Sequence, residues 1–204
     1  MTRRDFIKTA ALFTAGMFLP NETEAATKKV RVPQVTEFKT LDELEINKVF
    51  LKFDEMDRKP YTGAIVLHHA GMSKDRDMTV KEIHDLHVHG NHWSGIGYHF
   101  VIHKGGEIEF ARPLNYRGAH AFKNNEFTVG ICLTGNYEYG KPPMPQLKSA
   151  VQLVSALCEK YNFPPTDTTI FGHKDFGKTD CPGKNLYVKM PEIIQSSRKL
   201  LKLI

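Results

Sequence analysis

The chain has few cysteines, a single tryptophan and almost no long apolar run. Its 204 residues include three cysteines, too few for the disulfide framework of a small secreted scaffold. The longest apolar stretch runs from Ala10 to Leu19, and a helix of that length cannot cross the ~30 Å hydrocarbon core of a bilayer. These shortages exclude a disulfide-stabilised miniprotein and a protein with several membrane-spanning helices.

The three cysteines differ in their surroundings. Cys132 lies in an apolar run and Cys158 in a helical pattern, so both are expected to be buried. Two separate thiols and one disulfide are both compatible with these positions. Cys181 lies in a polar loop between Asp180 and Pro182, where a core role is not expected.

The composition indicates one compact domain with a short N-terminal extension. Of the residues, 41% are apolar, which is enough to fill a core at this length. The net charge is +5 and the isoelectric point is near 9.0, but Lys and Arg are dispersed along the chain. Because no basic cluster alternates with aromatic residues, nucleic acid is not an expected partner.

The first 26 residues resemble an export signal of the twin-arginine type. The pair Arg3-Arg4 is followed by Phe-Ile-Lys, an apolar run, and the small residues Ala25-Ala26. A receptor reads such a signal, which does not anchor the mature chain in the membrane. We therefore expect export to the periplasm or cell surface with no membrane span after the signal is removed; a non-cleaved N-terminal anchor is the alternative.

Hydrophobic periodicity predicts an α/β fold in the rest of the chain. Residues 27–60 are expected to form a charged N-terminal arm with short elements, and the main domain is expected to comprise residues 61–204. The expected elements are a buried strand at 64–67 that ends in His68-His69, a capped helix from 79 to about 90, a hairpin at 98–111, a strand at 127–133, a helix from Pro145, a strand at 168–171 and a last helix from Pro191. This pattern predicts a single domain with a central mixed β-sheet flanked by helices.

Three candidate metal ligands follow or end predicted strands. His68 ends the buried strand, His173 follows the strand at 168–171, and Cys181 follows eight residues later. Two imidazoles and one thiolate match the ligand preference of zinc, and three protein ligands leave a fourth position for water, as in catalytic sites. From spacing alone, a buried core histidine at 68 and an inert thiol at 181 remain the alternative.

Other histidines offer a competing arrangement. His84 and His87 share a face of the predicted helix at the spacing of a metal-binding pair. The same spacing also fits polar side chains at the solvent margin of an amphipathic helix.

Four ordered motifs give the chain a resemblance to type-2 amidases, the family that includes amidase-type phage lysozymes and peptidoglycan recognition proteins. They are Ile65–His69; Trp93–Ile102; Gly118–His120 with Asn125 and Val129–Ile131 behind it; and Gly172–Asp175 leading to Thr179–Gly183. They extend from about Gly63 to Gly183, most of the main domain.

The resemblance implies a zinc-dependent hydrolase. It implies that His68, His173 and Cys181 bind Zn²⁺. It also implies that Tyr98 acts at the site as a catalytic hydrogen-bond donor. Thr179 matches a position where members carry Lys or Thr facing the cleaved carbonyl, so this chain departs from the lysine-bearing branch.

The expected substrate is peptidoglycan or a muropeptide, cut between N-acetylmuramic acid and L-alanine. His120 and Asn125 match the substrate-side motif of the family, and His69 and Arg112 are further candidates to line the groove. Trp93 either stacks on a sugar or caps the core.

Further expectations concern the oligomeric state, the alternative function and the length of one loop. The chain is expected to be a monomer, and a non-catalytic peptidoglycan-binding module is the alternative function. Members of the family that lost activity typically replace the cysteine ligand, which is present here as Cys181. The resemblance also implies one extra residue between Leu86 and Trp93.

Overall fold

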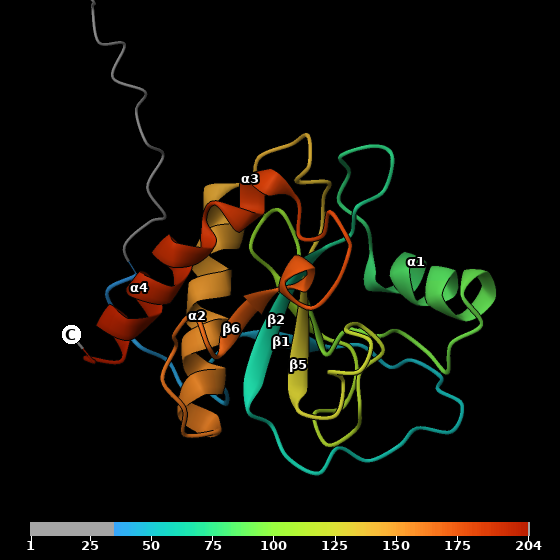
Figure 1. Cartoon of the computed structure of the whole chain (residues 1–204), viewed down its shortest axis with the longest axis horizontal. Coiled ribbons are helices and arrows are strands. Elements are labelled where there is room, and N and C mark those ends of the chain that lie inside the picture. The colour runs from blue at the N-terminus through green and yellow to red at the C-terminus, as the bar shows by residue number, and fades with distance from the viewer. Residues whose placement is uncertain (1–34, 204) are drawn as a thin grey trace, which may run out of the picture. The chain divides into compact units, whose positions relative to one another are not determined.

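Six strands form one mixed sheet in the computed structural model, which describes residues 35–203 (Figure 1). The strands are β1 (Ile46–Lys48), β2 (Ala64–His69), β3 (Phe100–Ile102), β4 (Ile108–Phe110), β5 (Thr128–Leu133) and β6 (Ile170–Gly172). Their order is β1-β4-β3-β5-β2-β6. β3, β5, β2 and β6 are parallel, β4 is antiparallel to β3, and β1 is parallel to β4.

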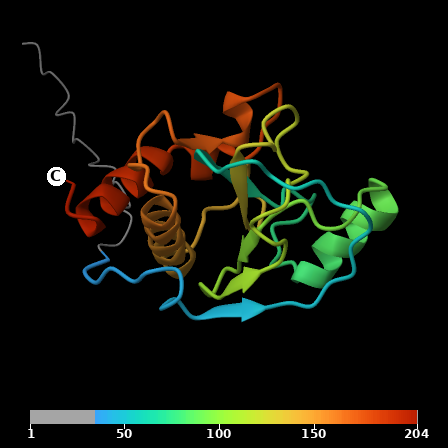
Figure 2. The ribbon, with the colours of Figure 1, turned by 90° about the horizontal axis from the view of Figure 1, so that it is seen from below.

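Helices cover both faces of this sheet. α2 (Met144–Lys160) and α4 (Met190–Leu200) pack together on one side, and α1 (Val80–Asp85) lies on the other (Figures 1 and 2). A short α3 (Lys184–Tyr187) precedes α4. The predicted single-domain α/β fold with a mixed sheet is confirmed.

Alternating side chains of the central strands supply two cores. Ile65 and Leu67 of β2 pack in the core beneath α2 and α4, whereas Val101 and Cys132 pack in the core beside α1. Because successive side chains of a strand point to opposite faces, His68 lies on the same face as Cys132, its register partner in β5.

The positions of Cys132 and Cys158 decide whether these two residues form a disulfide. Cys132 and Cys158 are both buried and unpaired, and they belong to the cores on opposite sides of the sheet. They are therefore two separate thiols, and the disulfide alternative is wrong.

Most predicted elements begin and end within a few residues of the observed helices and strands. The Thr79 capping box is present, with the Thr79 hydroxyl accepting from the Glu82 N–H and the Glu82 carboxylate accepting from the Thr79 N–H. The predicted helix does not stay α-helical to residue 90, because Leu86–Gly90 forms a π-helical turn. β1 and α3 were not among the predicted elements.

The segment before residue 61 packs on the same sheet. β1 extends the sheet beyond β4, and Phe38, Leu41 and Leu44 contact the core beneath α2. The predicted boundary at residue 61 stays a prediction. The predicted export signal at 1–26 lies outside the described residues.

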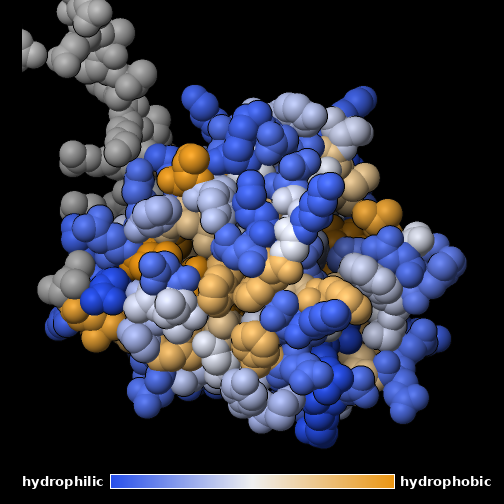
Figure 3. Space-filling model, in the orientation of Figure 1, coloured by the Kyte–Doolittle hydropathy of each residue, from blue (hydrophilic) through white to orange (hydrophobic). Residues whose placement is uncertain are grey.

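The helices and the surface of the described part of the chain can be compared with what a membrane span requires. No helix between residues 35 and 203 has the length and apolar character that a membrane span needs. The face in Figure 3 is largely hydrophilic, with smaller hydrophobic patches between polar side chains.

Candidate metal centre and its surroundings

Three side chains from distant parts of the sequence meet at one end of the sheet. β2 and β6 are parallel neighbours, so their carboxyl ends lie at the same edge. His68 stands near the end of β2, and His173 begins the 3₁₀ turn that follows β6. With Cys181 from the next loop, they offer ligand atoms that all lie within 4.8 Å of one another. Between residues 35 and 203 this is the one such group of metal-ligating side chains.

The donor chemistry of this group fits a soft or borderline cation. His68 is fully buried, and burial holds its pKa well below the usual range. Burial also lowers the pKa of His173 and raises that of the Cys181 thiol to about 12. Both imidazoles are therefore neutral at pH 7, with lone pairs available to a metal, and a bound cation would favour the thiolate that burial alone disfavours.

Tyr98 borders the three candidate ligands. Its ring centroid lies 5.0 Å from that of His68 and 5.3 Å from that of His87. Burial raises the pKa of the Tyr98 phenol well above its usual range. Its hydroxyl therefore keeps its proton at neutral pH and can donate a hydrogen bond.

The imidazole of His120 contacts the imidazole of His68 edge-on. His120 Nδ1 is 3.1 Å from His68 Nε2, and His120 Nε2 is 3.5 Å from the Thr128 hydroxyl oxygen. His120 is 6% exposed, and both of its ring nitrogens face protein atoms. Its contact with substrate stays a prediction.

Asn125 holds the backbone that carries His120. Its side-chain oxygen accepts hydrogen bonds from the N–H groups of His120 and Ala121, both at 2.9 Å. Asn125 also lines a groove of about 410 Å³, together with Ala119, the chain neighbour of His120. Asn125 thus stabilises the backbone of His120 and also lines the groove.

Arg112 lines the same groove but is largely buried. Its Nη1 donates to the carbonyl of Ile96 at 2.9 Å, and its guanidinium lies 5.5 Å from the centre of the Phe53 ring. Burial lowers its pKa to about 10, so it remains a cation at neutral pH. Its Nε is buried and has no hydrogen-bond partner within the described part of the chain.

Thr179 borders a second groove, which adjoins the first at Phe122 and Lys123. This groove has a volume of about 430 Å³ and is also lined by His173, Phe122 and Lys178. The Thr179 hydroxyl oxygen accepts from the Cys181 N–H at 3.2 Å. Its own proton is therefore free to be donated elsewhere.

Trp93 is partly exposed and does not sit in the core. It is 38% exposed, and its ring lies 4.7 Å from that of His87. Partial exposure is compatible with capping the core and with stacking on a sugar, so both alternatives for Trp93 stay predictions.

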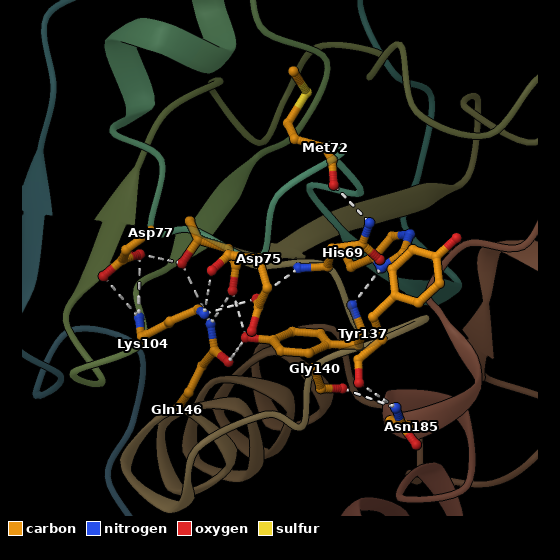
Figure 4. A network of polar contacts seen from close by, with 12 residues as sticks. His69, Met72, Asp75, Asp77, Lys104, Tyr137, Gly140, Gln146 and Asn185 are labelled. Atoms are coloured by element: carbon orange, nitrogen blue, oxygen red, sulfur yellow. Dashed lines mark hydrogen bonds and ion pairs between the residues drawn. The ribbon is translucent and has the colours of Figure 1, made fainter.

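His69 belongs to a polar network beside the centre. Its Nδ1 accepts from the Tyr137 N–H at 3.0 Å. In the same network Lys104 Nζ donates to Asp75 at 2.7 Å, and the Lys104 N–H donates to Asp77 at 3.2 Å (Figure 4). The His69 bond ties the end of β2 to the segment after β5, and the Lys104 bonds tie the loop after β2 to the turn between β3 and β4. His69 is 8% exposed, so its prominent contact is with this backbone, and a substrate contact stays a prediction.

His84 and His87 are both buried, so the interpretation that places them at a solvent margin is wrong. His84 Nδ1 accepts from the Ile96 N–H at 3.1 Å, and His87 Nδ1 accepts from the Gly97 N–H at 3.0 Å. Burial lowers the pKa of His87 to about 4. Each of them fixes the loop that leads into Tyr98.

Comparison with known proteins gives consistent matches. A family model described as N-acetylmuramoyl-L-alanine amidase matches residues 58–184. Peptidoglycan-recognition protein LB of Drosophila melanogaster is 31% identical over 132 residues, covering 62% of this chain and 56% of that protein.

Solved structures share the fold along most of their length. N-acetylmuramoyl-L-alanine amidase LysC from Clostridium intestinale has a TM-score of 0.66 and 32% identity, covering 78% of this chain and 98% of that one. A mutant of Drosophila PGRP-LB in complex with tracheal cytotoxin has a TM-score of 0.62 and 27% identity, covering 72% and 92%. The chain spans little more than half of the length of the curated LB protein.

Proposed function

The chain belongs to the N-acetylmuramoyl-L-alanine amidase family, and on that premise we propose that it is a zinc-dependent amidase. The bond cut is the amide between the lactyl group of N-acetylmuramic acid and L-alanine in peptidoglycan or its muropeptides. The observation that carries the proposal is the meeting of His68, His173 and Cys181 within 4.8 Å, beside Tyr98.

Zinc is the proposed cofactor because of the ligand chemistry. Two neutral imidazoles and one cysteine sulfur form a ligand set typical of zinc. When bound by three protein ligands, the metal supplies Lewis acidity and a water of lowered pKa, about 7 in well-studied sites.

The side chains around the centre orient and stabilise the reacting amide. Tyr98 keeps its proton because burial raises its pKa, so its hydroxyl donates toward the oxygen on which negative charge develops. Thr179 adds a second donor, since its oxygen already accepts from the Cys181 N–H. Neutral donors placed where charge develops typically lower the barrier by a few kcal/mol each, about 3–4 in a well-studied protease.

The two grooves, which adjoin at Phe122 and Lys123, accommodate different parts of the substrate. The groove with Arg112 and Asn125 offers a buried cation and amide, which suit the carboxylates and amides of a stem peptide. The groove with Thr179 carries the exposed Phe122 at its edge, which suits a sugar face. The complex of a PGRP-LB mutant with tracheal cytotoxin supports a muropeptide as ligand class.

Export is part of the proposal. The amide to be cut lies outside the cytoplasm, and the Arg3-Arg4 segment has the features of a receptor-read signal. We therefore place the enzyme in the periplasm or at the cell surface, as a monomer.

The test is digestion of purified muropeptides by the protein from residue 27 onward, with mass spectrometry of the products. Free stem peptide beginning with L-alanine is expected from the zinc-loaded protein. The product should disappear with a zinc chelator and with Cys181→Ser. Zinc-loaded protein that binds muropeptide without releasing this peptide would be a recognition module instead of an enzyme.

A further inference from the structure

A chain of buried hydrogen bonds runs from the candidate metal ligand His68 into the body of the protein. His68 Nε2 meets His120 Nδ1 at 3.1 Å, and His120 Nε2 approaches the Thr128 hydroxyl at 3.5 Å. The Thr128 hydroxyl then donates to the carbonyl of Asn124 at 2.6 Å. His68 and Thr128 are fully buried and His120 is 6% exposed.

We propose that His120 and Thr128 are positioning residues that fix the proton of His68 on Nε2 and so aim the Nδ1 lone pair of His68 at the metal. The inference rests on the proposed zinc site. It assigns to His120 a role separate from substrate contact, and it assigns a role to Thr128.

The direction of the bonds follows from the far end of the chain. The Asn124 carbonyl can only accept, so the Thr128 hydroxyl must be its donor. The remaining lone pair of Thr128 faces His120 Nε2, which therefore carries the hydrogen. A neutral imidazole has one N–H, so His120 Nδ1 accepts and His68 Nε2 donates.

The last consequence concerns the metal side of His68. With its proton on Nε2, His68 presents a bare Nδ1, which is the nitrogen 3.5 Å from the sulfur of Cys181. The hydrogen bond made by one ring nitrogen commonly selects which nitrogen binds a metal. The chain of hydrogen bonds thus leaves the Nδ1 lone pair of His68 available to a metal even in the metal-free protein.

The packing around His120 is shaped for this ring. A Cβ on Gly130 of β5 would lie 2.5 Å from the ring, and one on Gly118 would also collide with it. Asn125 holds the backbone of His120 from the other side through its bond to the His120 N–H. The two glycines therefore leave just enough room for the imidazole beside His68, and the Asn125 amide fixes the backbone that carries it.

The experiment measures zinc affinity, by competition with a chromophoric chelator, without any substrate. Thr128→Val keeps the shape of the side chain and removes the hydroxyl, and we expect an affinity about 10-fold lower; His120→Phe should lower it about 100-fold. Thr128→Ser restores the hydroxyl and should bind within about 3-fold of the wild type, which is less than the roughly 10–100-fold loss expected when an outer partner is removed.

A matched control separates this role from general destabilisation. Ser155→Ala removes a fully buried hydroxyl that donates to the Val151 carbonyl inside α2, away from the metal centre. It should leave zinc affinity unchanged. Urea unfolding of the chelator-treated variants records how much each substitution costs in stability.

The outcomes separate the inference from the proposed function. Weak zinc binding by Thr128→Val and His120→Phe, with wild-type affinity for Thr128→Ser and Ser155→Ala, supports the positioning role even if no muropeptide is cut. Wild-type affinity in all four variants overturns it while leaving the amidase proposal intact. Equal losses in Ser155→Ala and Thr128→Val overturn it too, and a wild type without zinc affinity overturns both.

A second readout does not depend on metal or on the variants. In protein labelled with ¹⁵N-histidine and freed of metal, two-bond proton–nitrogen spectra should report His68 and His120 both as Nε2–H tautomers. An Nδ1–H tautomer at His68 would overturn the inference.

Discussion

Replacing Gly130 with alanine tests how rigidly His120 is held against the sheet. The new Cβ would lie 2.5 Å from two carbons of the His120 ring, which is well inside van der Waals contact. The backbone at Gly130 has no positive φ, so alanine is otherwise allowed there. Any penalty therefore comes from the ring, which cannot retreat without losing its bond to His68.

Two effects of opposite sign set the magnitude. In a strand interior, alanine is usually favoured over glycine by about 0.5–1 kcal/mol because glycine loses more backbone entropy on folding. Overpacking a tight site costs about 1–3 kcal/mol. We expect Gly130→Ala to lower the free energy of unfolding by about 1–2 kcal/mol, because the ring is fixed from both sides. In a His120→Ala background the same change should instead raise it by about 0.5–1 kcal/mol.

The assay is a double-mutant cycle by urea unfolding, with chelator present so that metal binding does not contribute. The coupling between the two positions should be about 1.5–3 kcal/mol, as for residues in direct contact. If Gly130→Ala changes stability by the same amount and sign with and without the His120 ring, the proposed close packing is refuted.

Three further predictions address catalysis, metal and pH. Tyr98→Phe should lower the rate of muropeptide cleavage about 100–1,000-fold with little change in zinc affinity; an unchanged rate would remove Tyr98 from the mechanism. Zn²⁺ at about 100 times its Kd should raise the free energy of unfolding by about 2.7 kcal/mol, and Cys181→Ser should lose this gain in a thermal-shift titration. Burial lowers the pKa of His103, but hydrogen bonds to Glu109 and Asp77 outweigh burial and raise it. The stabilisation from His103 is therefore complete below its unfolded pKa of about 6.5 and is lost as the pH rises through the folded value. His103→Gln should remove that part of the pH dependence of the urea midpoint, and an unaltered profile would contradict the assignment.

The fold could be predicted from the sequence because it depends on strong local patterns, whereas the meeting of the candidate ligands could not be predicted from local patterns alone. The buried strand at β2 reads as an unbroken apolar run, and its last side chains necessarily reach a sheet edge. The parallel placement of β2 beside β6 then brings His68 and His173 together. No local signal linked them, since they are 105 positions apart, and the family motifs supplied that connection.

The sequence did not predict the interactions that depend on exact side-chain packing. His84 and His87 have helical spacing, but their hydrogen bonds go to backbone N–H groups some ten residues further on. The position of Thr128 at the start of β5 looks like an ordinary strand residue, and its bond to His120 appears only in three dimensions. β1 is three residues long, too short for periodicity to reveal.

The π-helical turn at Leu86–Gly90 explains how this chain tolerates a local change in length. The Asn91 N–H donates to the Leu86 carbonyl at 3.1 Å, closing a turn that holds one residue more than an α-helical turn. This matches the extra residue implied between Leu86 and Trp93. Deleting Gly90 would return the turn to α-helical winding and keep Trp93 in register, whereas the same deletion inside regular helix rotates everything downstream by about 100°. The turn therefore marks a point where we expect this chain to lose a residue without displacing Tyr98.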